Sequence, residues 1–505
     1  MKFSILVFGC QMNYADSARI KTILLNCGFS YTEDIKQADI VIFDTCSVRQ
    51  KAEDKITGTI KDLKKTQKIW ITGCMIQHSL RSGKLMSATA DNGKLKMGNF
   101  LGTITSKNPE IIGFTTDEID TLDTRYSSHV TVSINNIFNP IFHRLHMTYP
   151  NLELMRRIDD TGFLPLILKK LGYKITYDQE IINEYEKIVP QGINTSMNRG
   201  HQTTAYIPIS TGCNQFCSYC IVPYARGLEK NFPVKQIIDE AKIHLGNGAK
   251  EIVLLGQIVN KHPQFVEILK EILKLKGLQR LRYTSPYPTY YSDELLKLHE
   301  AEAKLCPHIH IPFQSGSDTI LKAMHRGYTL AQAKKFIDDI HSLKTKISIT
   351  TDIIVGFPGE TEEDFQQTLD LVKYGKFDMI YIGIYSPRPG TLAQRNYPDD
   401  IPYTVKHDRR ARLNEVLKKT SLENNEKEIG MIHTVLINNI EKPSTFSGYT
   451  EDMKQIIVQS VGCRVQSAEL KKHQTSDIKL QAKPGDFVQA RVTRGVPFKL
   501  YGKIF

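Results

Sequence analysis

Several features are missing from this sequence of 505 residues, and each absence excludes a class of protein. No apolar run approaches the roughly 18 residues that a membrane-spanning helix needs. Residues 1–10 lack the long apolar core and small-residue cleavage site of a signal peptide, so we expect a cytoplasmic protein with no membrane partner. Hydrophobic residues at 41% and charged residues at 24% exclude disordered and collagen-like chains.

Cysteine occurs nine times, which is an odd number in a chain without an export signal. This count argues against a disulfide framework and favours metal or redox chemistry. The cysteines are Cys10, Cys27, Cys46, Cys74, Cys213, Cys217, Cys220, Cys306 and Cys463. The net charge of +12 suits an anionic partner such as nucleic acid, although it does not prove one.

Short apolar runs alternate with helical patterns in residues 1–82, which predicts an open parallel α/β sheet. Strands are expected at 3–8, 40–43 and 68–71, and helices at 15–26 and 52–65. Cys10, Cys46 and Cys74 each follow one of these strands within a few residues. Loops after parallel strands gather at one edge of a sheet, so we expect the three thiols to converge there. Glycine beside two of them lets the backbone approach a bulky ligand closely.

The remainder of the chain divides into three further parts, and the whole is expected to be of the α/β class. The N-terminal α/β domain spans 1–125, with an insertion near 83–108, and residues 126–199 (mainly 126–195) form an insertion or linker without an assigned role. Regular strand and helix signals in 200–430 predict a partial parallel barrel of the TIM type, with its chemistry after the strands. Short strands in 431–505 predict a small β-barrel. Barrel strands are expected at 206–209, 251–255, 281–283, 308–312, 348–355 and 379–386.

Three further cysteines, Cys213, Cys217 and Cys220, lie within eight residues. Such a loop can hold three corners of a 4Fe–4S cube and leave the fourth iron open to another ligand. Tyr219 within the loop can stack on a planar base. The alternatives are a zinc site and three unrelated buried thiols.

This spacing, with an aromatic residue before the last cysteine, resembles the radical S-adenosylmethionine superfamily. The resemblance implies a 4Fe–4S cluster that binds S-adenosylmethionine and releases a 5'-deoxyadenosyl radical. Gly256 follows the second barrel strand, and Gly356 lies in a segment that resembles the adenine-binding turn of the superfamily. A plain strand-to-helix loop is the alternative for that turn.

The segments around Cys10, Cys46 and Cys74 resemble the cluster-binding segments of the methylthiotransferase family. The resemblance covers about 1–82 and 200–505, continues in residues 312–318, 324–329 and 385–391, and is nearest to the tRNA 2-methylthio-isopentenyladenosine synthases. It implies two 4Fe–4S clusters, each on three cysteines. Gln11 and Met12 favour the isopentenyl substrate over those of related families. The chain departs from the family pattern at Ala18, usually acidic, and at Ile258, usually Asn.

The implied activity is transfer of a methylthio group to carbon 2 of N6-isopentenyladenosine at position 37 of tRNA, with S-adenosylmethionine as methyl donor and radical source. The implied partners are a tRNA anticodon stem-loop and an electron donor such as flavodoxin or ferredoxin, and we expect a monomer. Rival hypotheses are a methylthiotransferase for threonylcarbamoyl-adenosine tRNA or a ribosomal protein, a non-catalytic iron-sulfur RNA-binding protein, and a zinc-stabilised RNA-binding protein.

Other residues have competing interpretations. Ser285 and Gln314 follow barrel strands and can bind S-adenosylmethionine or cap loops, and Arg226 can face an anionic substrate or form a surface salt bridge. The three remaining cysteines are interpreted as packing residues. The C-terminal barrel resembles the TRAM domain, an RNA-binding fold, and the alternative is a solvated charged face. Its candidate RNA-binding residues are Lys471, Lys472, Lys483, Arg491, Arg494, Phe498, Lys499 and Tyr501.

Overall fold

The computed structural model describes residues 1–46, 58–74, 76, 151–155, 164–176, 203–460 and 482–505. The described residues form two compact units, which are treated one at a time. The first unit draws on Met1–Ile193, Ser210–Phe232 and Arg388–Arg395, and the second on the rest of the chain. Within the described ranges, no helix is long and apolar enough to cross a membrane. The insertion expected near 83–108 and most of 126–199 lie outside the described residues.

The first unit is built on a five-stranded sheet in the order β2-β1-β3-β4-β5, with every neighbouring pair parallel. This confirms the open parallel sheet that the sequence predicts. Its strands are β1 (Lys2–Phe8), β2 (Ser30–Tyr31), β3 (Ile40–Thr45), β4 (Lys68–Gly73) and β5 (Leu152–Met155). The short helix η1 (Ile35–Gln37) precedes β3, and of the helix expected at 52–65 only residues 58–61 are described as helical.

Apolar side chains cover both faces of this sheet, which explains why its strands read as unbroken hydrophobic runs. On one face, Phe3, Ile42 and Trp70 pack with helix α1 (Gln11–Asn26) and helix α7 (Leu164–Lys170). On the other face, a second cluster contains Phe43 and Ile69. The sheet is therefore a buried platform that holds its strand ends rigidly.

Part of the segment expected as an insertion or linker belongs to this platform. β5 pairs with β4, and α7 packs on the same core as α1. Nothing in the local pattern of residues 151–176 shows which strand they join, because that pairing spans about 80 intervening residues. The structure therefore gives this segment a role that the sequence left unassigned.

The second unit contains a partial barrel with six parallel strands where the sequence predicts them. Two three-stranded sheets, β10-β9-β6 and β11-β12-β13, form its wall, and a parallel bridge joins Leu281 of β10 to Leu305. The strands are β6 (Thr204–Pro208), β9 (Glu251–Leu255), β10 (Arg280–Tyr283), β11 (His308–His310), β12 (Ser348–Val355) and β13 (Met379–Ile384). The structure thus has the α/β class and the barrel that the sequence predicts.

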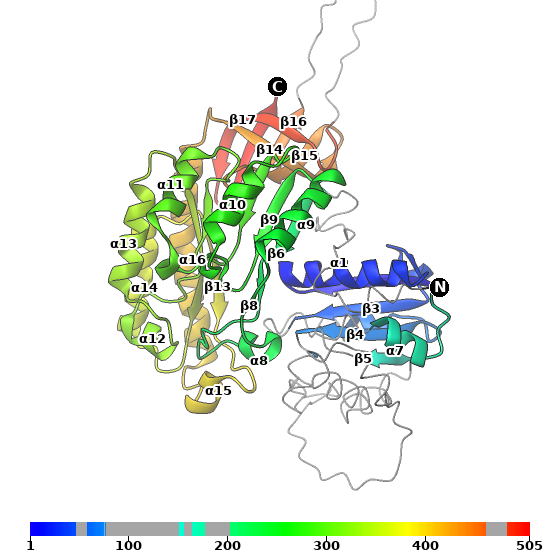
Figure 1. Ribbon diagram of the computed structural model, residues 1–505. Coiled ribbons are helices and arrows are strands. Elements are labelled where there is room, and N and C mark those ends of the chain that lie inside the picture. The colour runs from blue at the N-terminus through cyan, green and yellow to red at the C-terminus, as the bar shows by residue number, and fades with distance from the viewer. Residues whose placement is uncertain (47–57, 75, 77–150, 156–163, 177–202, 461–481) are drawn as a thin grey trace, which may run out of the picture. The chain divides into compact units, whose positions relative to one another are not determined.

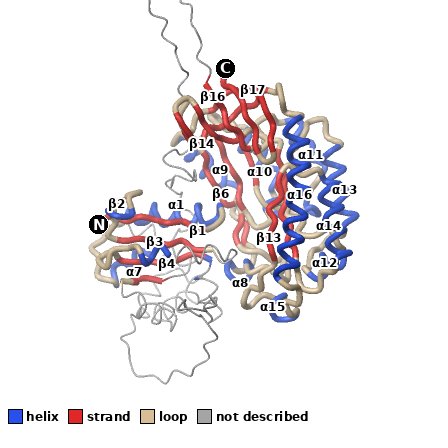
Figure 2. Tube along the Cα trace, turned by 180° about the vertical axis from the view of Figure 1, so that it is seen from behind, coloured by secondary structure: helices blue, strands red, loops and turns tan. Residues whose placement is uncertain are grey.

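Helices follow the strands and cover the outside of the barrel (Figure 1). Several begin at a capping side chain: Ser292, Thr329 and Thr361 each accept a hydrogen bond from the backbone N–H three residues on. Helix α16 runs beside β13 (Figure 2). The helices are α9 (Val234–Gly246), η4 (Val259–Lys261), α10 (Phe265–Leu273), η5 (Pro288–Tyr290), α11 (Asp293–Ala301), α12 (Asp318–Ala323), α13 (Leu330–His341), α14 (Glu362–Gly375) and α16 (Tyr403–Glu426). A further short helix, α15 (Leu392–Asn396), lies almost entirely in the first unit.

The C-terminal part is a closed barrel in the order β14-β15-β16-β18-β17. Its strands are β14 (Ile432–Lys442), β15 (Thr445–Tyr449), β16 (Gln455–Ser460), β17 (Phe487–Val496) and β18 (Lys499–Ile504). This agrees with the small β-barrel that the sequence predicts from short strands in 431–505. β15 and β18 each follow the preceding strand after a two-residue turn, Pro443–Ser444 and Pro497–Phe498.

Two arginines attach this small barrel to the first residues of the parallel strands. Arg282 donates to Glu251 at 2.8 Å and to the Thr450 carbonyl at 3.0 Å, and Arg280 donates to the Thr434 carbonyl. Both arginines are buried, and buried charges are tolerated where they are paired and hydrogen-bonded. The small barrel therefore lies at the amino-terminal ends of the strands, away from the ends where barrel enzymes place their chemistry.

A buried histidine strengthens the junction between α16 and the small barrel. The two ring nitrogens of His433 lie 3.1 Å from carboxylate oxygens of Glu428 and Glu451. Burial opposes the imidazolium charge, but hydrogen bonds to Glu428 and Glu451, together with the nearby Asp452, raise the pKa of His433 to about 10. Burial alone would raise the pKa of Glu428, but hydrogen bonds from His433 and Lys346 lower it to about 2.

His433→Gln is expected to lower the free energy of unfolding by about 2 kcal/mol at pH 6, because a charge-assisted pair is lost. Since the folded pKa of His433 is raised, its contribution is complete below its unfolded pKa near 6.5 and disappears as the pH rises through about 10. Calorimetric melting of parent and variant at several pH values measures this. A stability difference that persisted unchanged at pH 11 would contradict the assignment.

Candidate functional site

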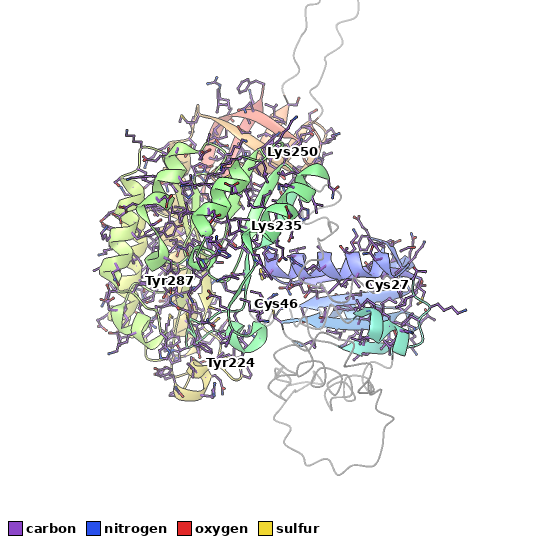
Figure 3. The ribbon with its side chains drawn as sticks, viewed as in Figure 1. Cys27, Cys46, Tyr224, Lys235, Lys250 and Tyr287 are labelled. Atoms are coloured by element: carbon purple, nitrogen blue, oxygen red, sulfur yellow. The ribbon has the colours of Figure 1, made fainter. Side chains whose placement is uncertain are left out.

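Register brings the three N-terminal cysteines to one edge of the sheet. The last residues of β1, β3 and β4 are aligned with one another in adjacent parallel strands. Cys46 and Cys74 directly follow β3 and β4, and Cys10 lies two residues after β1. Figure 3 shows Cys46 at this end of the sheet and Cys27 at the far end of α1. Cys46 and Cys74 are buried, whereas Cys10 is exposed. The convergence expected from the sequence is therefore present.

Asn13 connects two of these cysteine segments. Its Oδ1 accepts a hydrogen bond from the backbone N–H of Cys10 at 3.2 Å, and its Nδ2 donates to Asp44 at 2.7 Å and to the Thr45 carbonyl at 3.1 Å. Ser17 Oγ donates to the other oxygen of Asp44 at 2.7 Å. Burial, followed by the neighbouring Asp16 charge, raises the pKa of Asp44 to about 7. Asn13 was not predicted from the sequence to be a positioning residue, although it lies only three residues after Cys10.

The two glycines beside these cysteines, Gly9 and Gly73, lie against neighbouring segments of the protein. A Cβ on Gly73, whose φ is +98°, would overlap the backbone of Thr45, and a Cβ on Gly9 would overlap the side chain of Asn13. The two glycines therefore allow neighbouring protein segments to approach, which brings the cysteine loops together. The close approach of the backbone to a bulky ligand stays a prediction.

The second group of cysteines lies in a loop that a short hairpin closes. β7 (Ser210–Thr211) pairs with β8 (Lys230–Asn231), and helix α8 (Val222–Arg226) lies between them. The backbone N–H of Cys213 donates to Gly227 O at 3.1 Å, and that of Cys220 donates to Cys217 O at 2.9 Å. Cys213 and Cys217 are buried, and Cys220 is partly exposed. Tyr219 is in the same loop, and Ser210–Phe232 belongs to the first compact unit.

Each group offers three thiols, a donor set that suits a 4Fe–4S cube and also suits a zinc ion, so the residues present fit a cluster at both places. Among the residues that the structure describes, no group of three His, Cys, Asp or Glu side chains is placed to hold a single metal ion.

Arg226, the last residue of α8, is buried against the first group of cysteines. Its Nε lies 3.0 Å from Cys74 Sγ, and its Nη2 lies 2.6 Å from Asp16 Oδ2. Burial raises the pKa of Cys74, the Arg226 guanidinium lowers it, and the charges of Cys10 and Cys46 raise it. This mutual influence is additional evidence that the three sulfurs are neighbours. The sequence offered a surface salt bridge as one interpretation of Arg226, and the structure shows a salt bridge to Asp16 that is buried. The other interpretation, that Arg226 faces an anionic substrate, stays a prediction.

The barrel residues proposed to bind S-adenosylmethionine all follow parallel strands in the second unit. Ser285, Gln314 and Gly356 have positive φ values of 56°, 73° and 71°. Gln314 pairs through its backbone with β12, and the Gly356 N–H donates to Glu360 Oε2 at 2.7 Å. Gly256 is the first residue after β9. A left-handed backbone conformation is costly for a residue other than glycine and often occurs at functional sites. Ser285 and Gln314 therefore stay candidates for binding S-adenosylmethionine.

A row of polar side chains on β11, β12 and β13, formed by His310, Asp352 and Tyr381, was not predicted from the sequence. His310 Nε2 lies 3.1 Å from Asp352 Oδ2, and the ring centroids of His310 and Tyr381 are 5.7 Å apart. Asp352 is paired with Tyr381 in register, so both lie on one face of the sheet, and 54% of Tyr381 is exposed. The opposite face contains buried isoleucines such as Ile309 and Ile353. Helices cover the outside of such a barrel, so the polar row faces its interior. Alternation of polar and apolar residues in these strands was the available signal.

The candidate RNA-binding residues of the small barrel are only partly described. Lys471 and Lys472 lie outside the described residues, and Phe498 donates its N–H to Ser421 Oγ at 3.0 Å in the turn before β18. A surface groove of about 590 Å³ contains an arginine stacked on a tyrosine, with the Arg494 guanidinium 4.2 Å from the Tyr501 ring centre. The other basic residues on its lining are Lys442 and Lys503. Lys483, Arg491 and Lys499 are described but do not line it.

The remaining cysteines are packing residues where the structure describes them. Cys27 and Cys306 are buried, and burial raises the pKa of each to about 11. Cys463 lies outside the described residues. None of the eight described cysteines forms a disulfide, in agreement with the cysteine count.

Comparison with known proteins identifies the family. Residues 207–372 match the radical SAM superfamily, and residues 2–91 match a family described as Uncharacterized protein family UPF0004. A Carboxydothermus hydrogenoformans protein named tRNA-2-methylthio-N(6)-dimethylallyladenosine synthase is 33% identical, over 90% of this chain and 92% of the relative. A Fusobacterium nucleatum protein of that name is 32% identical over 100% and 99%. The chain belongs to this synthase family.

A third synthase of that name, from Clostridium tetani, is 34% identical over 90% of this chain and 89% of its own. A solved radical S-adenosylmethionine methyltransferase, TsrM from Kitasatospora setae, is 14% identical and covers 78% of this chain and 75% of its own, with a TM-score of 0.44. Membership in the synthase family makes the protein a radical S-adenosylmethionine enzyme, and this superfamily implies a 4Fe–4S cluster and S-adenosylmethionine.

Proposed function

We propose that this protein adds a methylthio group to carbon 2 of N6-isopentenyladenosine at position 37 of tRNA. The observation that carries the proposal is the presence of two groups of three cysteines in one compact unit, within a chain that matches the named synthases along nearly its whole length. An aromatic carbon with neither an acidic proton nor a leaving group does not react by acid–base chemistry alone. A radical route with an added sulfur source therefore fits this pair of sites.

We assign one 4Fe–4S cluster to each group of cysteines. Cys10, Cys46 and Cys74 would hold the first, and Cys213, Cys217 and Cys220 the second. With three protein ligands each, both clusters keep one open iron position. When bound, the clusters and S-adenosylmethionine supply the radical chemistry and the sulfur and methyl groups. The chain contributes the spacing of the thiolates and a buried surrounding.

The barrel residues have separate tasks in this proposal. Tyr219, Gly256, Ser285, Gln314 and Gly356 would bind S-adenosylmethionine, because they follow parallel strands or lie in the cysteine loop. In the barrel interior, Tyr381 can stack on the adenine ring of the tRNA nucleoside that is modified, and the His310–Asp352 pair can orient that ring through hydrogen bonds.

The small barrel is proposed to bind the RNA backbone. The groove with Lys442, Arg494 and Lys503 supplies positive charge for phosphates, and Tyr501 offers an aromatic ring.

The preference for an isopentenyl substrate rests on Gln11 and Met12. Gln11 is exposed beside Cys10, whereas Met12 is buried and marks the family rather than touching a substrate.

The proposed partners are a tRNA anticodon stem-loop and a one-electron donor such as flavodoxin or ferredoxin. An external electron is required because cleavage of S-adenosylmethionine to methionine and the 5'-deoxyadenosyl radical consumes one electron, which the donor would supply. We propose that the protein acts as a monomer, since one chain supplies all six cysteines to a single unit.

An anaerobic assay tests the proposal. The protein, reconstituted with iron and sulfide and given dithionite and S-adenosylmethionine, is incubated separately with isopentenylated tRNA, threonylcarbamoyl-adenosine tRNA and ribosomal protein. Mass spectrometry is expected to show hydrogen replaced by a methylthio group only in the isopentenylated tRNA. Product on either other substrate would overturn the substrate assignment. RNA binding without 5'-deoxyadenosine release would instead indicate a non-catalytic iron-sulfur protein.

A further inference from the structure

Arg226 belongs to the segment that contains the second group of cysteines, and its side chain contacts the first group. It lies six residues after Cys220, at the end of α8. Its guanidinium contacts Cys74 Sγ through Nε at 3.0 Å and Asp16 Oδ2 through Nη2 at 2.6 Å. Asp16 is on α1, the helix that starts directly after Cys10. All of these residues belong to the first compact unit.

The contact is buried, which gives it energetic weight. The side chains of Arg226 and Asp16 are 3% and 8% exposed. Removing two charges from water costs several kcal/mol for each ion, and their attraction offsets this only with good geometry and further hydrogen bonds. The Nε–H donated to sulfur is such a bond. An arginine fork can hold a carboxylate and a sulfur at once because its donors point in fixed directions.

Neighbouring contacts hold both partners of Arg226 in place. Asp16 is adjacent in sequence to Ser17, whose hydroxyl is bonded to Asp44 just before Cys46. Gly227, directly after Arg226, accepts the backbone N–H of Cys213 and has a φ of +78°. A shift of Arg226 would therefore move the backbone of the second cysteine loop as well as the first group of cysteines.

We infer that Arg226 is a positioning residue that sets the spacing between the two groups of cysteines and donates a hydrogen bond to one sulfur ligand of the N-terminal cluster. This inference rests on the proposed function, which supplies the two clusters. Its consequence is that the site of radical formation and the site of sulfur supply keep a defined separation, as transfer between them requires.

Two properties distinguish this role from a purely structural ion pair. Hydrogen bonds to the sulfur ligands help to set the reduction potential of an iron-sulfur cluster, and removing a donor disfavours the reduced, more negative state. Magnetic interaction between two reduced clusters also depends on the distance between them. An ion pair that only stabilises the fold would change the melting temperature and leave both properties as they are.

The test compares Arg226→Gln and Arg226→Lys with the parent and with Arg395→Gln. Arg395 is a matched control because it also contacts α8, with Nη2 3.4 Å from Tyr224 Oη, but its side chain is exposed, and its other hydrogen bonds go to the backbone carbonyls of Gly390 and Thr391. The readouts on reconstituted protein are iron per chain, the midpoint potential of each cluster and the spin–spin interaction in the electron paramagnetic resonance spectrum of the reduced protein. With S-adenosylmethionine and isopentenylated tRNA, the ratio of 5'-deoxyadenosine to methylthiolated product is added.

For Arg226→Gln we expect a lower potential of the N-terminal cluster only, a changed spin–spin interaction, and at least about a tenfold rise in that ratio, equivalent to about 1.4 kcal/mol. Arg226→Lys, which retains the charge, should recover part of each change, and Arg395→Gln should match the parent. Unchanged potential and ratio in a folded Arg226→Gln protein with full iron would overturn the inference. If Arg226→Gln fails to fold, identical parent and Arg226→Lys values would overturn it. Absence of product with the parent would instead count against the proposed function, since potentials and spin coupling need no tRNA.

Discussion

Cys46→Ala is expected to halve the iron content and abolish methylthio transfer, while 5'-deoxyadenosine formation continues. Cys46 follows the central strand β3, between the strands that precede Cys10 and Cys74, so its loss leaves two thiolates that are not neighbours across adjacent strands. Iron after reconstitution should fall from about eight to about four per chain, because each cube holds four. Iron analysis and product quantification by mass spectrometry measure both effects.

Cys27→Ala is the matched control for this experiment. Cys27 is a buried cysteine in the same unit, at the opposite end of α1, and its sulfur packs in the core. It should retain about eight irons and full transfer activity, apart from a modest loss of stability from the smaller side chain. If Cys46→Ala kept the parent iron content, the assignment of a cluster to the N-terminal cysteines would be wrong.

Cys217→Ala is expected to abolish both 5'-deoxyadenosine formation and product, which separates the two cluster sites. Cys217 is the middle cysteine of the loop between β7 and α8, and its carbonyl accepts the N–H of Cys220. Loss of its thiolate should remove the cluster that binds S-adenosylmethionine, and activity should fall to that of a reaction without protein. The N-terminal cluster should remain, with about four irons per chain.

Cys306→Ala provides the corresponding control in the second unit, since Cys306 is buried and lies outside both groups of cysteines. Its 5'-deoxyadenosine yield should equal that of the parent. A Cys217→Ala protein that still produced 5'-deoxyadenosine would refute the assignment of the radical site. Both variants are expected to keep about four irons and to lose the product, but only Cys46→Ala should still form 5'-deoxyadenosine, a difference that a general folding defect does not produce.

The outline of the fold and the placement of the cysteines after the strands and in one short loop were predictable because they depend on local signals. The strands before Cys10, Cys46 and Cys74 are continuous apolar runs, and parallel strands place the following loops at one edge. The loop of Cys213, Cys217 and Cys220 is contained within eight residues. Both patterns survive without knowledge of the tertiary structure, because strand period and thiol spacing are properties of short segments.

Other features depended on contacts between distant segments. β5 joins β4 across about 80 residues, and Arg226 reaches Cys74 across 152 residues and Asp16 across 210. In the sequence, Arg226 is one basic residue among 66, and its burial is not visible. The contacts of the glycines next to the cysteines also depend on distant segments or on local folding, since Gly73 lies against the backbone of Thr45 and Gly9 against the side chain of Asn13.

The sequence by itself therefore determined the chemistry that is available: two groups of three thiolates, a parallel barrel and a basic small barrel, all encoded in short-range patterns. Only the tertiary structure decided how these parts are held, through Asn13, the Arg226–Asp16 pair and the inward row of His310, Asp352 and Tyr381. The physical reason is that burial and hydrogen bonding between remote residues arise when the chain closes on itself, and residue type alone does not specify which partner each buried charge will find.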